Sequence, residues 1–224
     1  MTISIGNLVA MPNQQIFADA TGNMLAIAEP GSGATTALLM AACRHVEASD
    51  WSAVVFAPST PDLRAGLRVS AAKLLSGMGA KYLEHHRTYV FKSGATLKLA
   101  AQDSMDARDI QGMCFSFVGF NHIERFDPKF VMTAATRARE TVAYRQAPIG
   151  MLRILHALRI MPGPMVTVRP RACAVVSSNV NVSTIEWAES AFQNRIRMRT
   201  EENTHLAPEV VQFLRNASME HYAE

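Results

Sequence analysis

The first stretch with residues suited to chemistry is Glu29–Thr36, EPGSGATT. A short apolar run precedes it, and an apolar run with helical spacing follows it. A strand, a glycine-rich turn and a helix start in this order present backbone N–H groups to a phosphate. The usual pattern is G-x-x-x-x-G-K-[ST], whereas this chain has Ala28 for the first glycine and Ala34 for the lysine. The pattern therefore predicts a phosphate-binding loop that lacks its main positive charge.

Backbone N–H groups in this loop remain able to bind an anion at the start of the helix. Thr35 stands where the pattern has a hydroxyl that binds Mg²⁺, so it is the metal-ligand candidate. The alternative is a loop that only closes the turn between a strand and a helix. The candidate nucleotide-binding residues of the loop are Gly31, Ser32, Gly33, Ala34, Thr35 and Thr36.

Polar residues also follow two later apolar runs. They are Asn121–Glu124, after Cys114–Phe120, and Ser177–Asn179, after Arg171–Val176. In an open parallel sheet, ligands bind outside the carboxyl ends of the strands. We therefore expect these two segments to meet Glu29–Thr36 in one crevice. If the strand continued past Phe120, the side chain of Glu124 would point to the opposite face of the sheet.

The elements that must position these residues alternate along the chain, which predicts an α/β fold with a mainly parallel sheet flanked by helices. We expect a core over residues 1–180 and a helical linker or appendage over 181–224. Runs typical of strands are Leu25–Ala28, Trp51–Pro58, Cys114–Phe120 and Arg171–Val176, with a hairpin of Arg87–Phe91 and Thr96–Ala100. Helical spacing covers Thr35–Glu47, Asp62–Gly77, Pro128–Val142, Ser183–Met198 and Pro208–Tyr222. Ile149–Met161 is expected to form a further helix or a long turn.

Length and composition are those of an ordinary globular domain. The chain has 224 residues, of which 49% are hydrophobic and 18% are charged, and its net charge is +3. No apolar run approaches the ~18 residues that a membrane span needs, so no membrane association is expected. Cys43, Cys114 and Cys173 form no C-x-x-C pair and stand in apolar surroundings, which favours buried free thiols.

Arginine accumulates in the second half of the chain. Between residues 125 and 199 there are twelve Lys or Arg against four Asp or Glu. Because arginine makes bidentate contacts to phosphate, one interpretation is a surface that binds a nucleic-acid backbone. The alternative is a solvated basic face, or one that meets an acidic neighbour. The DNA-binding candidates are Arg137, Arg139 and Arg145.

The ordered motifs resemble the N-terminal ATPase domain of the large terminase subunit of tailed phages, a DNA-packaging motor. PGSGATTALLMAAC resembles the family's Walker A loop and helix, and FSFVGFNHIERF resembles its Walker B strand. ENTHLAPEVVQFL resembles the linker segment that follows the domain. The resemblance covers roughly residues 12–222 and stops where the family's nuclease domain would begin. It implies a P-loop NTPase fold of the ASCE or RecA-like class, and we expect no nuclease activity.

The resemblance also implies roles for residues outside the loop. Gln14 or Gln15 resembles the family's adenine-contacting glutamine, and Gln15 is taken as the candidate. Arg108 resembles the arginine that reaches into a neighbouring subunit's site. Ser177, Ser178 and Asn179 resemble the coupling motif. The implied ligands are ATP and Mg²⁺, and the implied partners are double-stranded DNA, other terminase subunits or the portal, and further copies in a ring. The implied location is the host cytoplasm.

Three departures from the family pattern fall on the positions on which phosphoryl transfer depends most. Ala34 replaces the Walker A lysine, Asn121 the Walker B aspartate, and His122 the glutamate that polarises the attacking water. The leading hypothesis is therefore a degenerate packaging ATPase that acts through DNA or partner contacts, with nucleotide and metal binding weak or lost. One alternative is an active ATPase that uses His122 or Glu124 as base and Arg64 or Arg108 in place of the lysine. Another alternative is a scaffold protein that keeps only the fold.

Overall fold

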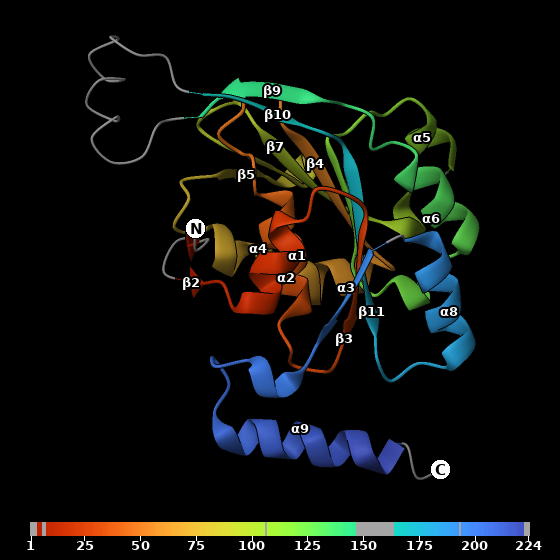
Figure 1. The fold of residues 1–224 in the computed structure, drawn as a ribbon. Helices are drawn as coiled ribbons and strands as arrows, with labels where there is room; N and C mark the ends of the chain where they lie inside the picture. The colour runs from red at the N-terminus through yellow and green to blue at the C-terminus, as the bar shows by residue number, and fades with distance from the viewer. Residues whose placement is uncertain (1–3, 6–7, 106, 147–163, 193, 222–224) are drawn as a thin grey trace.

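One large sheet organises the molecule. The computed structural model describes residues 4–5, 8–105, 107–146, 164–192 and 194–221. Its eight strands follow the order β12-β3-β11-β8-β4-β7-β6-β5, and the pairs from β12 to β7 are parallel (Figure 1). The strands are β3 (Met24–Ala28), β4 (Ser52–Ala57), β5 (Lys81–Leu83), β6 (Thr88–Val90), β7 (Thr96–Ala101), β8 (Phe117–Phe120), β11 (Arg171–Ser177) and β12 (Asn194–Met198).

Helices cover both faces of this sheet, as Figure 1 shows. One face carries a large apolar cluster, which includes Leu38 of α2 and Leu74 of α4; the other carries a second cluster around Phe120 and Phe130. The first face is covered by α1 (Pro12–Asp19), α2 (Ala34–Ala42) and α4 (Arg68–Leu75), and the second by α5 (Ala107–Gln111), α6 (Pro128–Ala135) and α8 (Val182–Ala191). This architecture confirms the expected α/β fold with its mainly parallel sheet.

The central strands are apolar without alternation because each of them is buried on both faces. Every residue of β3 and β8 is buried, as are all residues of β4 after Ser52. Gly119 in β8 marks the closest approach of a helix to the sheet. A Cβ atom there would lie 3.1 Å from Val55 and 3.2 Å from Leu38 of α2. The helix that follows the phosphate loop is therefore seated directly on the sheet.

The hairpin of β6 and β7 confirms the sequence prediction, whereas three predicted helices are too long. The helix predicted over Thr35–Glu47 ends at Ala42. The helix from Pro128 ends at Ala135, and Val142–Arg145 forms strand β9, which pairs with β10 (Met165–Val168). The helix predicted to end at Met198 ends at Ala191, and β12 then pairs with β3. The expectation of a purely helical segment after residue 180 is therefore wrong for β12. Ile149–Met161, predicted as a helix or a long turn, lies outside the described residues.

The predicted helix over Ser183–Met198 extends too far because its last residues form β12, which is an edge strand. Its charged residues Arg195 and Arg197 are exposed, whereas Met198 is buried. An edge strand with charges on one side resembles a polar helix when only a helical period is tested.

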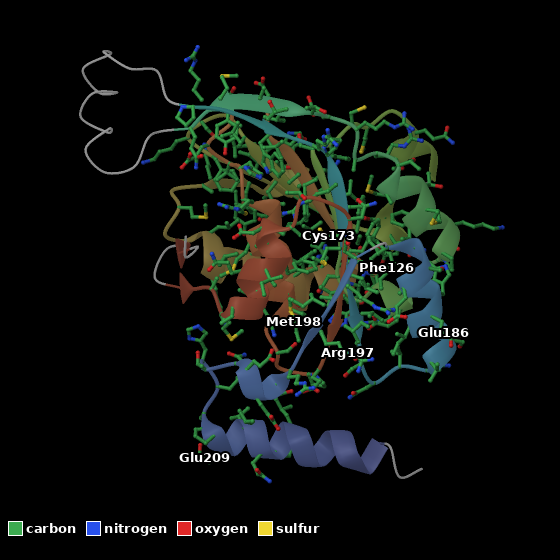
Figure 2. All side chains as sticks on the ribbon, viewed as in Figure 1. Phe126, Cys173, Glu186, Arg197, Met198 and Glu209 are labelled. Carbon is green, nitrogen blue, oxygen red and sulfur yellow. The ribbon has the colours of Figure 1, made fainter. Side chains whose placement is uncertain are left out.

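The last part of the chain lies beyond the end of β12. Figure 2 shows Met198 on the strand that leads to the C-terminal helices and Glu209 at the start of the last one. These are the 3₁₀ helix η5 (Thr200–Glu202) and α9 (Pro208–His221). Within the described residues, no helix has the length and apolar character that crossing a membrane requires.

Two of the three cysteines are buried, as expected, and one is not. Cys43 and Cys173 lie in the core, and burial raises the pKa of the Cys43 thiol to about 12. Cys114 is exposed, so the prediction of three buried thiols is wrong there. It follows α5 at the point where the chain enters the strand region, before the buried run of β8 begins.

Candidate phosphate-binding site

The glycine-rich loop connects β3 to α2 at the carboxyl edge of the sheet. Gly31 and Gly33 have φ values of +78° and +79°, in the left-handed region that favours glycine. Gly33 is the N-cap of α2, and its carbonyl accepts a hydrogen bond from the Ala37 amide at 3.0 Å. The first backbone N–H groups of α2, at Ala34 and Thr35, have no acceptor within the helix, as at any helix start. They form the donor set that an anion requires.

Ser32 gives a further sign of a polar ligand at this loop. It is only 3% exposed, and its hydroxyl has no hydrogen-bond partner among the described residues. Buried hydroxyls are normally paired, so this one is a donor available to a bound oxyanion. Its backbone N–H, by contrast, is bonded to the Glu29 carbonyl at 3.1 Å.

Gln14 of α1 contacts the loop. Gln14 is buried, its Nε2 donates to the Gly33 carbonyl at 3.1 Å, and its Oε1 accepts from the Met11 amide at 3.1 Å. Gln15 is turned toward Asp19 on the same helix. The geometry therefore links Gln14 to the site through the loop backbone, and the choice of Gln15 as the nucleotide contact stays a prediction.

A hydrogen bond joins the loop helix to the end of β8. Thr35 Oγ1 donates to Asn121 Oδ1 at 2.9 Å, and Asn121 is 6% exposed. These are the two residues for which the sequence predicts the places of the magnesium-binding hydroxyl and the Walker B carboxylate. Here each satisfies the other, and both are neutral. Two neutral oxygens are weak ligands for Mg²⁺, which favours carboxylates and phosphate oxygens. No group of three or more Cys, His, Asp or Glu in the described part of the chain could hold a metal ion.

The segment after Asn121 turns back toward the site. His122 has φ +62° and ψ +59°, a left-handed conformation that is uncommon for a residue with a side chain, and the 3₁₀ helix η4 (Ile123–Arg125) follows it. The strand therefore does not continue, so the condition under which Glu124 would point to the opposite face is not met. Instead, Glu124 Oε1 lies 3.1 Å from His122 Nδ1, and Oε2 accepts from the Ser177 amide at 3.2 Å.

These contacts bring the three strand ends together, as predicted. The Ser177 amide at the end of β11 is bound to Glu124, and the Ser178 amide donates to the Ala28 carbonyl of β3 at 2.9 Å. Asn179 is exposed beside them, and its backbone N–H donates to the Ser177 hydroxyl at 3.4 Å. The Glu124 carboxylate, with 8% of its side chain exposed, thus connects the end of β8 to the end of β11.

An ion pair connects the segment after β4 to η4, which follows β8. Asp62 follows β4 and pairs with Arg125 of η4 at 2.8 Å. The Ser59 hydroxyl and then the Arg125 guanidinium lower the pKa of the Asp62 carboxyl, despite some desolvation. Arg64, a candidate replacement for the missing lysine, is exposed on the π-helical turn η1 (Leu63–Leu67) after this pair. The side chain of the other candidate, Arg108 on α5, lies outside the described side chains.

The three candidate DNA-binding arginines differ in their surroundings. Arg137 is partly buried, and its Nη1 donates to the Gln111 carbonyl of α5 at 2.9 Å. Arg139 is exposed but donates to the Thr136 carbonyl at 2.5 Å. Arg145 is exposed at the end of β9. Arg139 and Arg145 are thus the accessible members of this set.

Comparison with known proteins identifies the family. The family model described as "Terminase large subunit, T4likevirus-type, N-terminal" matches residues 27–224. The chain belongs to this family of large terminase subunits. No curated protein matches the chain significantly.

Solved structures of terminases share the fold. The chain is similar to the large terminase of a thermophilic bacteriophage, with 14% identity and a TM-score of 0.56 over 89% of this chain and 48% of that one. It also resembles the same phage's large terminase in complex with ADP, at 13% identity and TM-score 0.54, covering 89% and 48% of the two chains. The complex of that terminase with ATP-gamma-S gives 13% identity and TM-score 0.56, covering 89% and 47%. The chain thus spans about half the length of these relatives.

Proposed function

We propose that this chain is a phage DNA-packaging ATPase domain that binds nucleotide phosphates through its loop backbone and has lost efficient hydrolysis. The Thr35–Asn121 hydrogen bond is the observation that carries this proposal. It joins the two places that bind Mg²⁺ in a working site, and neither residue bears a charge. Ala34, beside Thr35, leaves the phosphates without the cation that normally neutralises them. The unpaired Ser32 hydroxyl supports the retained binding, as do the first amides of α2, which have no acceptor within the helix.

The expected loss of hydrolysis rate favours an inactive ATPase over an active one. Removing one electrostatic contact to a transition state costs ~10²–10³ in rate, about 3–4 kcal/mol. Three such contacts are replaced here, at Ala34, Asn121 and His122. Their effects need not add, but even one of them reduces turnover to a small fraction of a normal ATPase rate. Phosphate binding by backbone amides is less affected, because those donors do not come from the side chains at positions 34, 121 and 122.

A specific contact favours the alternative of an active enzyme. The carboxylate of Glu124 lies 3.1 Å from Nδ1 of His122, while the His122 side chain is 45% exposed. A carboxylate at one ring nitrogen fixes the tautomer and leaves the other nitrogen available to accept a proton. His122 would then accept the proton of the attacking water, and Glu124 would hold the ring in place.

Steady-state ATP hydrolysis with double-stranded DNA separates the two proposals. Under the first, the natural chain shows no turnover above background, and the combined changes Ala34→Lys, Asn121→Asp and His122→Glu create it. Under the second, the natural chain hydrolyses ATP, and His122→Ala and Glu124→Gln each reduce the rate at least ~10²-fold. Turnover by the natural chain that requires both Thr35 and Mg²⁺ would contradict the first proposal.

We further propose DNA as a partner, with other terminase subunits or the portal as protein partners and a ring of copies as the assembly. The exposed Arg139 and Arg145 support the contact with DNA. The expected result is DNA affinity that falls steeply as salt rises, and a shallower dependence when both residues are changed to Gln. The scaffold hypothesis predicts neither DNA binding nor a thermal shift with ADP.

A further inference from the structure

The segment after β12 binds the outer side of the phosphate loop. We call residues 198–214 the C-terminal strap. The Thr200 amide donates to Glu29 Oε2 at 2.8 Å, and the Thr200 hydroxyl donates to the Pro30 carbonyl at 2.8 Å. Asn203 Nδ2 donates to the Gly31 carbonyl at 2.6 Å. Three successive residues of the loop are thus held by the strap.

Apolar side chains of the strap also pack against the loop. A Cβ atom at Gly31 would lie 2.6 Å from Leu214 Cδ1 and 3.2 Å from Leu206 Cδ1, so the strap packs directly against this glycine. Asn13 of α1 is in turn hydrogen-bonded to Glu202 of the strap. Strap, loop and α1 therefore form one connected layer beside the start of α2.

The hydrogen bonds determine which way the peptide groups of the loop face. In a trans peptide, the C=O of one residue and the N–H of the next point in opposite directions. Because Thr200 holds the Pro30 carbonyl, the Gly31 N–H faces away from the strap. Because Gln14 holds the Gly33 carbonyl from the other side, the Ala34 N–H also has a fixed direction. Asn203 likewise fixes the peptide between Gly31 and Ser32, whose N–H is bonded to Glu29.

We infer that Thr200 and Asn203 are positioning residues: they hold the loop backbone in the conformation that presents its remaining donors, the Gly31 and Ala34 amides, to a bound diphosphate. This inference rests on the proposed function, since it assumes that the loop binds nucleotide phosphates. The orientation of the loop matters because Ala34 stands where a lysine would bind the phosphates. Without that lysine, the affinity for phosphate depends on amide dipoles, and a dipole stabilises the anion only when its N–H points at it. A strap that turned or released these peptides would weaken phosphate binding without touching the ligand.

Isosteric substitutions in the strap test this inference. Asn203→Asp replaces the donating Nδ2 with an oxygen that repels the Gly31 carbonyl, and Thr200→Val removes the hydroxyl without changing the shape. Binding of ADP and of inorganic pyrophosphate is measured by calorimetry. We expect each substitution to weaken the binding of both probes about 5- to 10-fold, the equivalent of one lost hydrogen bond. Because pyrophosphate lacks a base and a sugar, an equal loss for both probes places the effect at the phosphates.

Controls separate positioning from general destabilisation. Thr204 is exposed next to Asn203, so Thr204→Asp adds the same charge and Thr204→Val the same apolar change without touching the loop. Both should bind the two probes like the natural chain. The ¹⁵N amide resonances of Gly31 and Ala34 give a second readout, because they should shift on pyrophosphate addition in the natural chain and shift less in Asn203→Asp.

The outcomes distinguish this inference from the proposed function. If the natural chain binds neither probe, the proposed nucleotide binding is wrong, and the inference falls with it. If the natural chain binds both probes and the two strap variants bind equally well, only the inference is overturned. A loss of affinity shared by the Thr204 controls would also overturn it, because the effect would then be one of charge or stability.

Discussion

At the scale of single residues, the phosphate loop shows how backbone conformation and side-chain contacts act together. Gly33 combines a left-handed φ with a close approach: a Cβ atom would lie 2.5 Å from Gln14 Nε2 and 3.1 Å from the Met11 methyl group. The glycine thus permits both the turn into α2 and the hydrogen bond from Gln14. A side chain at this position would disturb the two features that define the loop.

Gly33→Ala should therefore lower the free energy of unfolding by about 1–2 kcal/mol, because alanine is strained at this φ and displaces Gln14. Gly66 supplies the matched control, since a Cβ atom there meets no atom within 4 Å. Gly66→Ala should leave the stability unchanged or raise it by up to ~1 kcal/mol. Urea denaturation of the two variants measures the difference. Equal effects would contradict this account of Gly33.

At the scale of elements, α1 is attached to the sheet by a buried arginine. Arg171, at the start of β11, is 3% exposed and donates to the Ala18 carbonyl at 2.6 Å and to the Ala20 carbonyl. Its guanidinium also lies 5.5 Å from the centre of the Phe117 ring. The last carbonyls of a helix lack partners within the helix, so this side chain satisfies them and fixes α1 in place. The position of Gln14 follows from that of α1.

Arg171→Met should destabilise the protein by about 2–4 kcal/mol, because it leaves the buried Ala18 carbonyl and the partly buried Ala20 carbonyl without this donor. Arg169→Met is the control two residues away, where the side chain is exposed, and should change stability by less than about 0.5 kcal/mol. Denaturant midpoints and slopes of both variants provide the measurement. A similar loss in both would mean that the charge of this region matters more than the attachment of α1.

Strands could be predicted from the sequence where burial on both faces requires that nearly all their residues be apolar. Strands buried on both faces carry continuous apolar runs, so β3, β4, β8 and β11 could be recognised, and the rule for parallel sheets then placed their carboxyl ends together. Nothing in the sequence indicates that His122 adopts a left-handed conformation, and this turn is what brings Glu124 into the site. The contact between Asn203 and Gly31 joins residues 172 positions apart, and no local pattern encodes it.

At the scale of the whole molecule, we expect the stability to depend on pH through His45, which contacts residues from several parts of the chain. His45 follows α2, its Nδ1 lies 3.1 Å from the Tyr144 hydroxyl of β9, and its ring centre lies 5.0 Å from that of Trp51. Burial, and then the charges of Arg44 and Arg171, lower the pKa of His45 from 6.5 to about 4, while Asp19 opposes the shift. The folded protein therefore keeps this ring neutral under conditions in which the unfolded chain is protonated.

The sign of the effect follows from linkage. Above pH 6.5 the ring is neutral in both states and contributes no pH dependence. Between pH 6.5 and about 4 the unfolded chain binds a proton that the folded protein does not, so the free energy of unfolding falls as pH falls, by at most about 3 kcal/mol.

His45→Gln should flatten the stability profile across this window, since glutamine does not titrate and can still bond to Tyr144. His205→Gln, at an exposed position, is the control and should retain the natural slope. Chemical denaturation at half-unit steps from pH 7.5 to pH 4 measures the three profiles, and a natural slope in His45→Gln would show that other groups cause the acid destabilisation.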